Sequence, residues 1–473
     1  MTSPIEVDAL AETTTASILY QNSTQDVFLL DIPTSIAAAQ GRSDTLLSTP
    51  PLEQPIHLDH VPQPKMKQAE THKSLHACNT VLHSEYKALI ESALAEIRAH
   101  VSNSWCTPRQ LMSPAPINRE LQITADAAAE KELETRLKEW SAWTESKGDD
   151  VAFDLQQMMA SLGATADHGS TAAAAVPHTW LMSHCPAHEF PTGTQAAGSA
   201  SQQPPTEPWQ SSFHNPESQL LELTIAEPSS QHGQLGQRYR FTIPPGSTLF
   251  LSDTSHPDAF RATFREITDQ HNLPRHFDLV LLDPPWPNRS AKRKGAYDQV
   301  GGMPFVKRML LRLDIDNYLK HNALVGIWIT NKESLREHVL GPGGLFETWN
   351  VGLVEEWIWI KTTTQGEPMF DIDNAMRKPY EILLLGRAAP NSWTTMTHAQ
   401  HIQRRVIAAV PDIHSRKPCL KELFEQYMPD QRNYTALEVF PRCLVSGWTS
   451  WGNEVIKYNW DRYWTSGNAA ACS

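Results

Sequence analysis

Short, continuous apolar runs recur along the second half of the chain and alternate with amphipathic segments. Six of these runs predict strands, at residues 247–251, 277–283, 324–330, 355–361, 381–386 and 435–440. A strand that is apolar on both faces is covered on both faces, as in parallel sheets that carry helices on either side. Two segments between the runs, 332–339 and 420–427, have apolar side chains at helical spacing. The alternation predicts a doubly wound α/β domain over residues 219–465.

The N-terminal part of the chain carries different patterns. Residues 17–20 and 26–32 predict two short strands around a turn, and so a small strand element within residues 1–40. Residues 41–72 are polar and rich in proline, a composition typical of a linker.

Two amphipathic helices are predicted after this linker. Apolar residues recur at i, i+3, i+4 and i+7 from Tyr86 to Val101. A second helix over residues 125–146 places three large apolar side chains on one side: Leu133, Leu137 and Trp140. Together the helices predict a helical accessory domain over residues 73–160.

Two further segments lack this regularity. Residues 161–218 consist mostly of Ala, Gly, Ser, Pro, Gln and Thr with little periodic hydrophobicity, which predicts a disordered insertion. Residues 466–473 are interpreted as a tail.

Composition narrows the class of protein. The 473 residues are 40% hydrophobic, enough for a substantial core, and the formal net charge is −13. Such a charge argues against a protein that coats nucleic acid through a broad positive field. We expect no secretion and no membrane association, because no signal peptide and no apolar run of spanning length is found. Six scattered cysteines fit a reducing compartment.

The tetrapeptide from Asp283 to Trp286 follows an apolar run and carries the clearest chemistry of the chain. Ligands of open α/β sheets bind beyond the carboxyl ends of the strands, so this loop is expected to face a pocket. The Asp283 carboxylate and the Pro284 carbonyl could accept the two hydrogens of an exocyclic amine, and Trp286 could stack on a base. The predicted catalytic residues of an adenine-methylation site are Asp283, Pro284, Pro285 and Trp286. The alternative is an ordinary turn.

A basic segment begins directly after the tetrapeptide. Between Pro287 and Arg312 the chain has seven cations and a single acid, Asp298, for a local charge of +6. A charge run is often only a solvated face, but this one adjoins the predicted pocket and so predicts contacts to phosphates. The predicted substrate contacts are Trp286, Asn288, Arg289, Lys292, Arg293, Lys294 and Tyr297.

Three segments resemble one known family in the same order. They are Val-Leu-Leu-Asp-Pro-Pro-Trp-Pro-Asn-Arg-Ser at 280–290, Pro-Asp-Ile-His-Ser-Arg-Lys-Pro at 411–418, and Gly-Trp-Thr-Ser-Trp-Gly-Asn-Glu-Val at 447–455. The stretch from residue 240 to residue 460 resembles the adenine-N(6) methyltransferases of the MT-A-seventy type, and most closely the branch of methyltransferase-like protein four. The resemblance implies a Rossmann-like methyltransferase domain that uses S-adenosylmethionine.

The resemblance also implies which residues contact the cofactor. Lys417 corresponds to a lysine that meets the cofactor carboxylate, and Arg442 to an arginine beside the ribose. Pro441 stands where the family has a small residue, which puts the local backbone geometry in question. For each position the alternative is a surface-loop residue. The implied cofactor residues are Asp253, Asp283, Lys417, Arg442, Asn453 and Glu454, and no metal is required.

The predicted reaction is an in-line transfer of the sulfonium methyl to the adenine amine, which Asp283 and Pro284 polarise and position. One alternative is a catalytically silent partner that binds RNA or a sister subunit. Another is an enzyme that acts on a protein glutamine or a small molecule. The intact tetrapeptide disfavours the silent partner, and its first and last residues, Asp283 and Trp286, favour adenine as the acceptor.

The nature of the polynucleotide follows only from the resemblance. It points to small nuclear RNA with 2'-O-methyladenosine as the acceptor, and DNA adenine is the competing substrate. We expect a nuclear location, with the cytoplasm as the alternative. A monomer is favoured, in which the N-terminal helices replace a partner subunit or grip the substrate.

Overall fold

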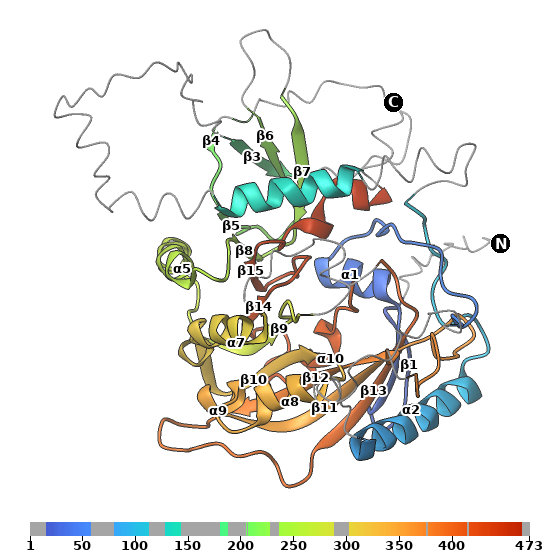
Figure 1. The fold of residues 1–473 in the computed structure, drawn as a ribbon. Helices are drawn as coiled ribbons and strands as arrows, with labels where there is room; N and C mark the ends of the chain where they lie inside the picture. The colour runs from blue at the N-terminus through green and yellow to red at the C-terminus, as the bar shows by residue number, and fades with distance from the viewer. Residues whose placement is uncertain are drawn as a thin grey trace, which may run out of the picture.

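Two sheets and the helices packed on them make up the fold of the computed structural model (Figure 1). The structure describes these residues: 16–57, 80–112, 128–142, 180–187, 205, 207–227, 236–287, 302–374, 377–413 and 416–465.

The larger sheet has 11 strands in the order β1-β2-β13-β11-β12-β10-β9-β14-β15-β8-β5. Strands β1, β12 and β5 are antiparallel to their neighbours, and the other eight run parallel to one another. The strands are β1 (Ile18–Gln21), β2 (Val27–Leu30), β5 (Ser212–His214), β8 (Thr248–Leu251), β9 (Phe277–Leu282), β10 (Leu319–Ile329), β11 (Val351–Lys361), β12 (Tyr380–Ala388), β13 (Gln403–Ala409), β14 (Ala436–Val439) and β15 (Thr449–Gly452).

Helices cover both faces of this sheet, which confirms the predicted doubly wound α/β fold. The helices are α1 (Ile32–Gln40), α2 (Thr80–His100), α5 (Pro257–His271), α7 (Gly302–Arg312), α8 (Glu333–Leu340), α9 (Leu345–Thr348) and α10 (Lys421–Glu425), with 3₁₀ turns η2 (Ile315–Tyr318), η3 (Lys457–Asn459) and η4 (Asp461–Tyr463). Successive side chains at the end of β9 point to opposite faces of the sheet and pack in different hydrophobic clusters. Val280 and Leu282 pack with α2, α5, α7 and α8, whereas Leu279 and Leu281 pack with α1 and α10.

The two N-terminal strands are an extension of the large sheet. Strand β2 pairs in parallel with β13, from Val27 opposite Val406 to Leu30 opposite Ala409. Part of the predicted linker is also packed, because Leu46 and Leu47 are buried. The prediction of a linker is therefore wrong for residues 41–57, where two adjacent leucines anchor an otherwise polar segment.

Both predicted amphipathic helices are present, but they lie against different sheets. Helix α2 buries Tyr86, Ile90 and Ile97 and contacts β2, β11 and β13. The second helix spans residues 128–142 and packs on the smaller sheet. That sheet is antiparallel and consists of β4 (Glu207–Pro208), β3 (Leu181–Pro186), β6 (Leu221–Ala226) and β7 (Arg238–Ile243). Each helix has one apolar face, and in the described residues a sheet covers it.

Trp140 anchors the helix at 128–142 to the smaller sheet. Its indole is buried and makes edge contacts with Trp180 and Tyr239, each at 5.3 Å between ring centroids. We expect Trp140→Ala to lower the free energy of unfolding by about 3–5 kcal/mol in a denaturant titration, because the lost packing leaves a cavity. Trp393→Ala is the matched control, since Trp393 is 94% exposed. Equal effects of the two substitutions would contradict this packing.

The structure corrects the prediction of disorder for part of residues 161–218. Strand β3 lies there and pairs with β6 along its whole length, and β5 pairs with β8. These short strands have few apolar residues, so they leave little periodic signal. The same reason explains why β15 escaped prediction. Strand β13 does contain an apolar run, Val406 to Ala409, but it was overlooked behind a polar start. Strand β13 begins with Gln403 and two arginines, Arg404 and Arg405, whose charges are met by Glu356 and Glu355 on β11.

Candidate active site

Four parallel strands of the large sheet, in the order β9-β14-β15-β8, end side by side. Gly452 of β15 is paired with Leu251 of β8, and Val439 of β14 is paired with both Trp451 and Leu282. The loops that follow these strands therefore leave the same edge. Each of these loops carries a predicted site residue shortly after its strand, the first ones being Asp253, Asp283, Arg442 and Asn453. This edge is where open α/β sheets bind their ligands.

Asp283 occupies the first position after β9. Its backbone N–H donates to the Val439 carbonyl at 3.2 Å, which extends the ladder between β9 and β14 by one bond. Its side chain is 35% exposed and accepts a hydrogen bond from Lys417 Nζ at 2.7 Å. The structure thus joins two residues that are 134 positions apart in the sequence and that were predicted to share one site.

Lys417 contacts two carboxylates. Its ammonium also lies 3.3 Å from Glu381 of β12, and 5.2 Å from the centre of the Trp328 ring. Burial alone would lower the pKa of Lys417, but the charges of Asp283 and Glu381 outweigh it and raise that pKa. Lys417 is therefore cationic, and an ammonium has three donors, so one remains for a ligand.

Glu381 is the second acid of this cluster. Lys361 of β11 contacts it at 2.6 Å. Burial would raise the pKa of Glu381, yet the nearby Lys417 and Lys361 ammonium groups more than offset this and hold it at about 2. Glu381 is consequently a fixed negative charge that orients Lys417 toward Asp283.

Hydrogen bonds of Trp286 fix the rest of the tetrapeptide. The Trp286 backbone N–H donates to the Pro284 carbonyl at 2.7 Å, so this carbonyl already has one partner. The Trp286 indole is 7% exposed, and its Nε1 donates to the Trp328 carbonyl at 2.6 Å. This packing ties the loop to β10. Only a small part of the indole is left as a stacking face.

Arg442 and Glu454 form an ion pair across the loops after β14 and β15, at 2.7 Å. Phe440 has a left-handed φ of 66° just before Pro441, which is uncommon for a bulky residue. This turn follows β14 directly and leads the chain to Arg442. Asp253 is 45% exposed at the end of β8, with its side chain accepting a bond from the Ser255 N–H.

Sequence reasoning missed two acids of this region, Glu381 and Glu438. Both interrupt strands that are otherwise apolar, and an acid in a buried strand is costly unless it has a function or a partner. That position is the signal that could have identified them. Glu438 lies on β14, in register with Leu281 of β9 and Ser450 of β15.

Burial raises the pKa of Glu438 to about 8, and the charge of Asp283 adds to the rise while Lys417 opposes it. Because the folded pKa lies above the ordinary 4.5, the folded state loses stability as the pH rises from about 4.5 to about 8. Glu438→Gln removes this loss. We expect its melting temperature, relative to wild type, to increase by on the order of 2 °C between the two ends of this range, as measured by calorimetry. A difference that does not change with pH would contradict the assignment.

The predicted substrate contacts from Asn288 to Tyr297 lie outside the described residues. Within the described ranges, no three His, Cys, Asp or Glu side chains are grouped to hold a metal ion. None of the helices in that part of the chain is both long and apolar enough to cross a bilayer.

Comparison with known proteins agrees with this geometry. The family model described as MT-A70 matches residues 277–454. These include β9, the loop from Asp283 to Trp286 that follows it (the signature loop), Lys417 and Arg442. Residues 277–454 belong to the MT-A70 family. The matched segment begins at β9, and β8, α2 and the smaller sheet precede it in the chain.

Three relatives illustrate the similarity of the chain. The "N6-methyladenosine RNA methyltransferase MTA1" of Cryphonectria parasitica is 42% identical over 189 residues, 40% of this chain and 54% of the relative. The human "N(6)-adenine-specific methyltransferase METTL4" is 33% identical over 230 residues, 47% and 44% of the two chains. The "DNA N6-methyl methyltransferase" of Caenorhabditis elegans is 33% identical over 217 residues, 46% and 53%. The matches span about half the length of these curated relatives.

Proposed function

We propose that this protein is an S-adenosylmethionine-dependent enzyme that methylates the N(6) amine of adenine in a polynucleotide. The contact between Lys417 and Asp283 carries the proposal. In this contact the carboxylate of the signature loop lies next to a cation with a spare donor, at the kind of sheet edge where open α/β sheets bind ligands, which supports the proposal. The MT-A70 membership of this domain supports the same reaction.

The charged groups at this edge suit the proposed cofactor. S-Adenosylmethionine carries a carboxylate, an ammonium, a sulfonium and a ribose diol, so its site needs cations as well as acids. Lys417 could meet the carboxylate, and Asp283 the ammonium. The paired Arg442 and Glu454, with Asn453 beside them, offer donors and acceptors for the ribose hydroxyls.

Bound S-adenosylmethionine supplies the methyl group as an electrophile. The aryl amine of adenine is a weak nucleophile because its lone pair is delocalised into the ring. Asp283 would accept one amine hydrogen and Pro284 the other through its remaining lone pair, which favours a tetrahedral, nucleophilic nitrogen. Trp286 would hold the loop against β10 through its bond to the Trp328 carbonyl. The released proton can leave after transfer, so Asp283 acts by orientation.

RNA is the favoured polymer, and DNA is the alternative. Two fungal relatives, from Cryphonectria parasitica at 42% identity and from Pyricularia oryzae at 38%, are named as RNA methyltransferases, and the nematode relative is named as a DNA methyltransferase. Within the RNA hypothesis, we retain small nuclear RNA with 2'-O-methyladenosine as the acceptor. We also propose that the protein is a monomer and that it acts in the nucleus.

The direct test is methyl transfer to RNA and DNA oligonucleotides of the same sequence, each with a single adenine, and an RNA with 2'-O-methyladenosine at that position. The modified nucleoside is identified by mass. The proposal expects N(6)-methyladenine in RNA at a kcat/KM above that in DNA, and highest with the ribose methylated. A preparation that binds S-adenosylmethionine but methylates none of the three would point to a silent partner subunit instead.

A further inference from the structure

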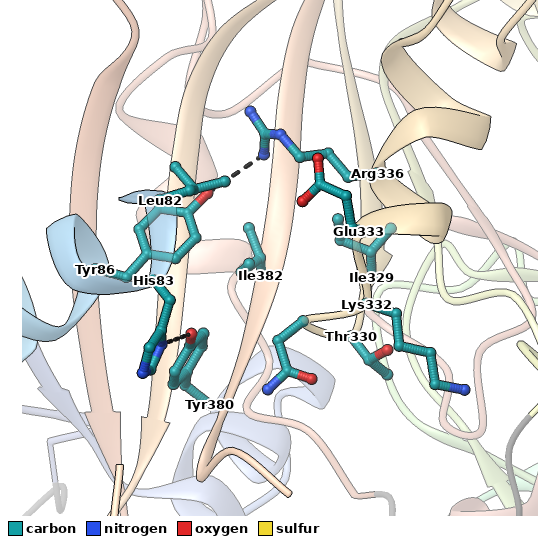
Figure 2. Close-up of a pocket in the computed structure, with 11 residues that line it drawn as sticks. Leu82, His83, Tyr86, Ile329, Thr330, Lys332, Glu333, Arg336, Tyr380 and Ile382 are labelled. Atoms are coloured by element: carbon teal, nitrogen blue, oxygen red, sulfur yellow. Dashed lines mark hydrogen bonds between the residues drawn. The ribbon is translucent and has the colours of Figure 1, made fainter. Parts of the chain in front are cut away.

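The large sheet fixes the two acids that contact Lys417. Asp283 continues β9 through its backbone bond to β14, and Glu381 is part of β12. On the opposite face of β12, the hydroxyl of Tyr380 is bonded to His83 of α2 at 2.7 Å (Figure 2). Because the backbone of both acids is fixed in this way, the geometry of the charged cluster depends on where the lysine is held.

Lys417 follows β13 in a segment that has no helix or strand among its described residues. This Lys417 segment comprises residues 410–413 and 416–418. Arg109 donates one hydrogen bond to the carbonyl of each of its first two residues, both at 2.8 Å. Its further attachment comes from side chains instead of a sheet ladder.

Arg416 provides this attachment, directly before Lys417. Its Nη1 donates to the Asp412 carboxylate at 2.6 Å and to the Leu47 carbonyl at 3.0 Å. The central carbon of its guanidinium lies 4.4 Å from the centre of the Tyr458 ring, within the range of a cation–π contact. Arg416 therefore joins the Lys417 segment to the N-terminal and the C-terminal parts of the chain.

The partners of Arg416 are held in turn. The Ser48 hydroxyl donates to the other oxygen of the Asp412 carboxylate, and the Leu47 N–H donates to the Tyr463 carbonyl at 2.8 Å. Leu47 and Ser48 are buried. Leu47, Ser48 and Tyr463 all lie outside the segment that the MT-A70 model matches. The lysine of the candidate site is thus anchored by parts of the chain that the family motifs do not contain.

Stability alone does not account for this arrangement. The side chains of Arg416 and Asp412 are 1% and 0% exposed, and a buried ion pair is often no more stabilising than an apolar pair of similar volume. Among the described residues, Nε and Nη2 of Arg416 have no hydrogen-bond partner, which is a further cost. What the pair does supply is one defined geometry for the residue that follows it.

We propose that Arg416 is the positioning residue for Lys417. It ties the Lys417 segment to Leu47 and Asp412, so that the ammonium stays between its two carboxylate partners and meets the carboxylate of S-adenosylmethionine. The inference rests on the proposed function and deepens it, because it names the residues that organise the site of the cofactor carboxylate. It also assigns a role to the N-terminal segment around Leu47 and Ser48.

The test is isothermal titration of S-adenosylmethionine into Arg416→Met, at a temperature at which the protein is folded. We expect the Kd to rise about tenfold, because Lys417 is still present but has lost a charged anchor. Ser48→Ala removes one bond to Asp412 and should raise the Kd about threefold, and it decides the question if Arg416→Met does not fold. Trp140→Ala is the matched control, since it removes a buried side chain from the packing of the smaller sheet and should leave the Kd unchanged.

Decarboxylated S-adenosylmethionine distinguishes positioning from a general disturbance, because it lacks the group that Lys417 would meet. If Arg416 acts through Lys417, Arg416→Met and Ser48→Ala should change the Kd of this analogue by less than about twofold. Equal weakening of both ligands would overturn the inference, as would an unchanged Kd of S-adenosylmethionine in every variant that folds. Failure of the proposed function looks different, since the wild type would then not bind S-adenosylmethionine at all.

Discussion

Asp283→Asn is expected to lower kcat for methyl transfer about 10²- to 10³-fold, the usual cost of removing one preorganised electrostatic contact to a reacting group. Asparagine keeps the shape of the side chain but loses the charge that faces Lys417 at 2.7 Å and would face the amine. The measurement is the single-turnover rate with saturating oligonucleotide. The fold should be preserved, because the Asp283 carboxylate is 35% exposed and its backbone bond to Val439 is unaffected.

The matched control is Asp269→Asn, at an acid on α5 that is 75% exposed. It should retain the wild-type rate within a factor of about two, because a surface charge pair contributes little. If both variants methylate at the wild-type rate, Asp283 is not the residue that positions the amine, and the role assigned to the signature loop fails.

Lys417→Met should weaken the binding of S-adenosylmethionine about 100-fold or more, the range measured when one partner of a largely buried charge pair is removed. Lys417 is 17% exposed, and its loss would leave Asp283 and Glu381 without the cation between them. Isothermal titration of the cofactor gives the affinity. Lys361→Met is the control, because Lys361 contacts Glu381 alone among these acids.

The two lysine variants should share a pH effect. In the wild type the pKa of Glu381 is held at about 2, below its ordinary 4.5, so Glu381 stabilises the fold above about pH 4.5 and the gain is lost as the pH falls toward 2. Removal of either ammonium raises that pKa, and acid unfolding should begin at a higher pH. If only Lys417→Met loses cofactor affinity, the loss cannot come from the change in the Glu381 pKa, which both variants share. Equal losses of affinity in both variants would contradict a direct contact between Lys417 and the cofactor.

The sequence predicted the architecture because the central strands are apolar on both faces. Strands β9, β10, β11 and β12 all include a predicted apolar run, since each is covered by helices or loops on either side. Strand β15 gave no such signal, and the short apolar run of β13, Val406 to Ala409, follows three polar residues that concealed it. Their polar residues are satisfied by long-range partners, such as Arg405 with Glu355, that local patterns do not contain.

In the candidate site, too, some residues can be recognised from local sequence and others only from long-range contacts. Asp283, Lys417 and Arg442 are recognisable in their motifs, and the structure brings Asp283 and Lys417 into contact. Glu381 stands outside these motifs and acquires a role only through the pairing of β12 with its neighbours. The contact of Arg416 with the Leu47 carbonyl was also beyond prediction, because it joins residues 369 positions apart in the sequence.

The most direct test of the account is mass analysis of nucleosides from one RNA oligonucleotide, treated with wild type or Asp283→Asn and methyl-labelled S-adenosylmethionine. Cofactor binding is measured on the same preparations. The account predicts labelled N(6)-methyladenine with the wild type and at most a trace with Asp283→Asn, although the variant is folded. Label on another atom or another nucleoside, or equal N(6)-methyladenine from both proteins, would contradict it.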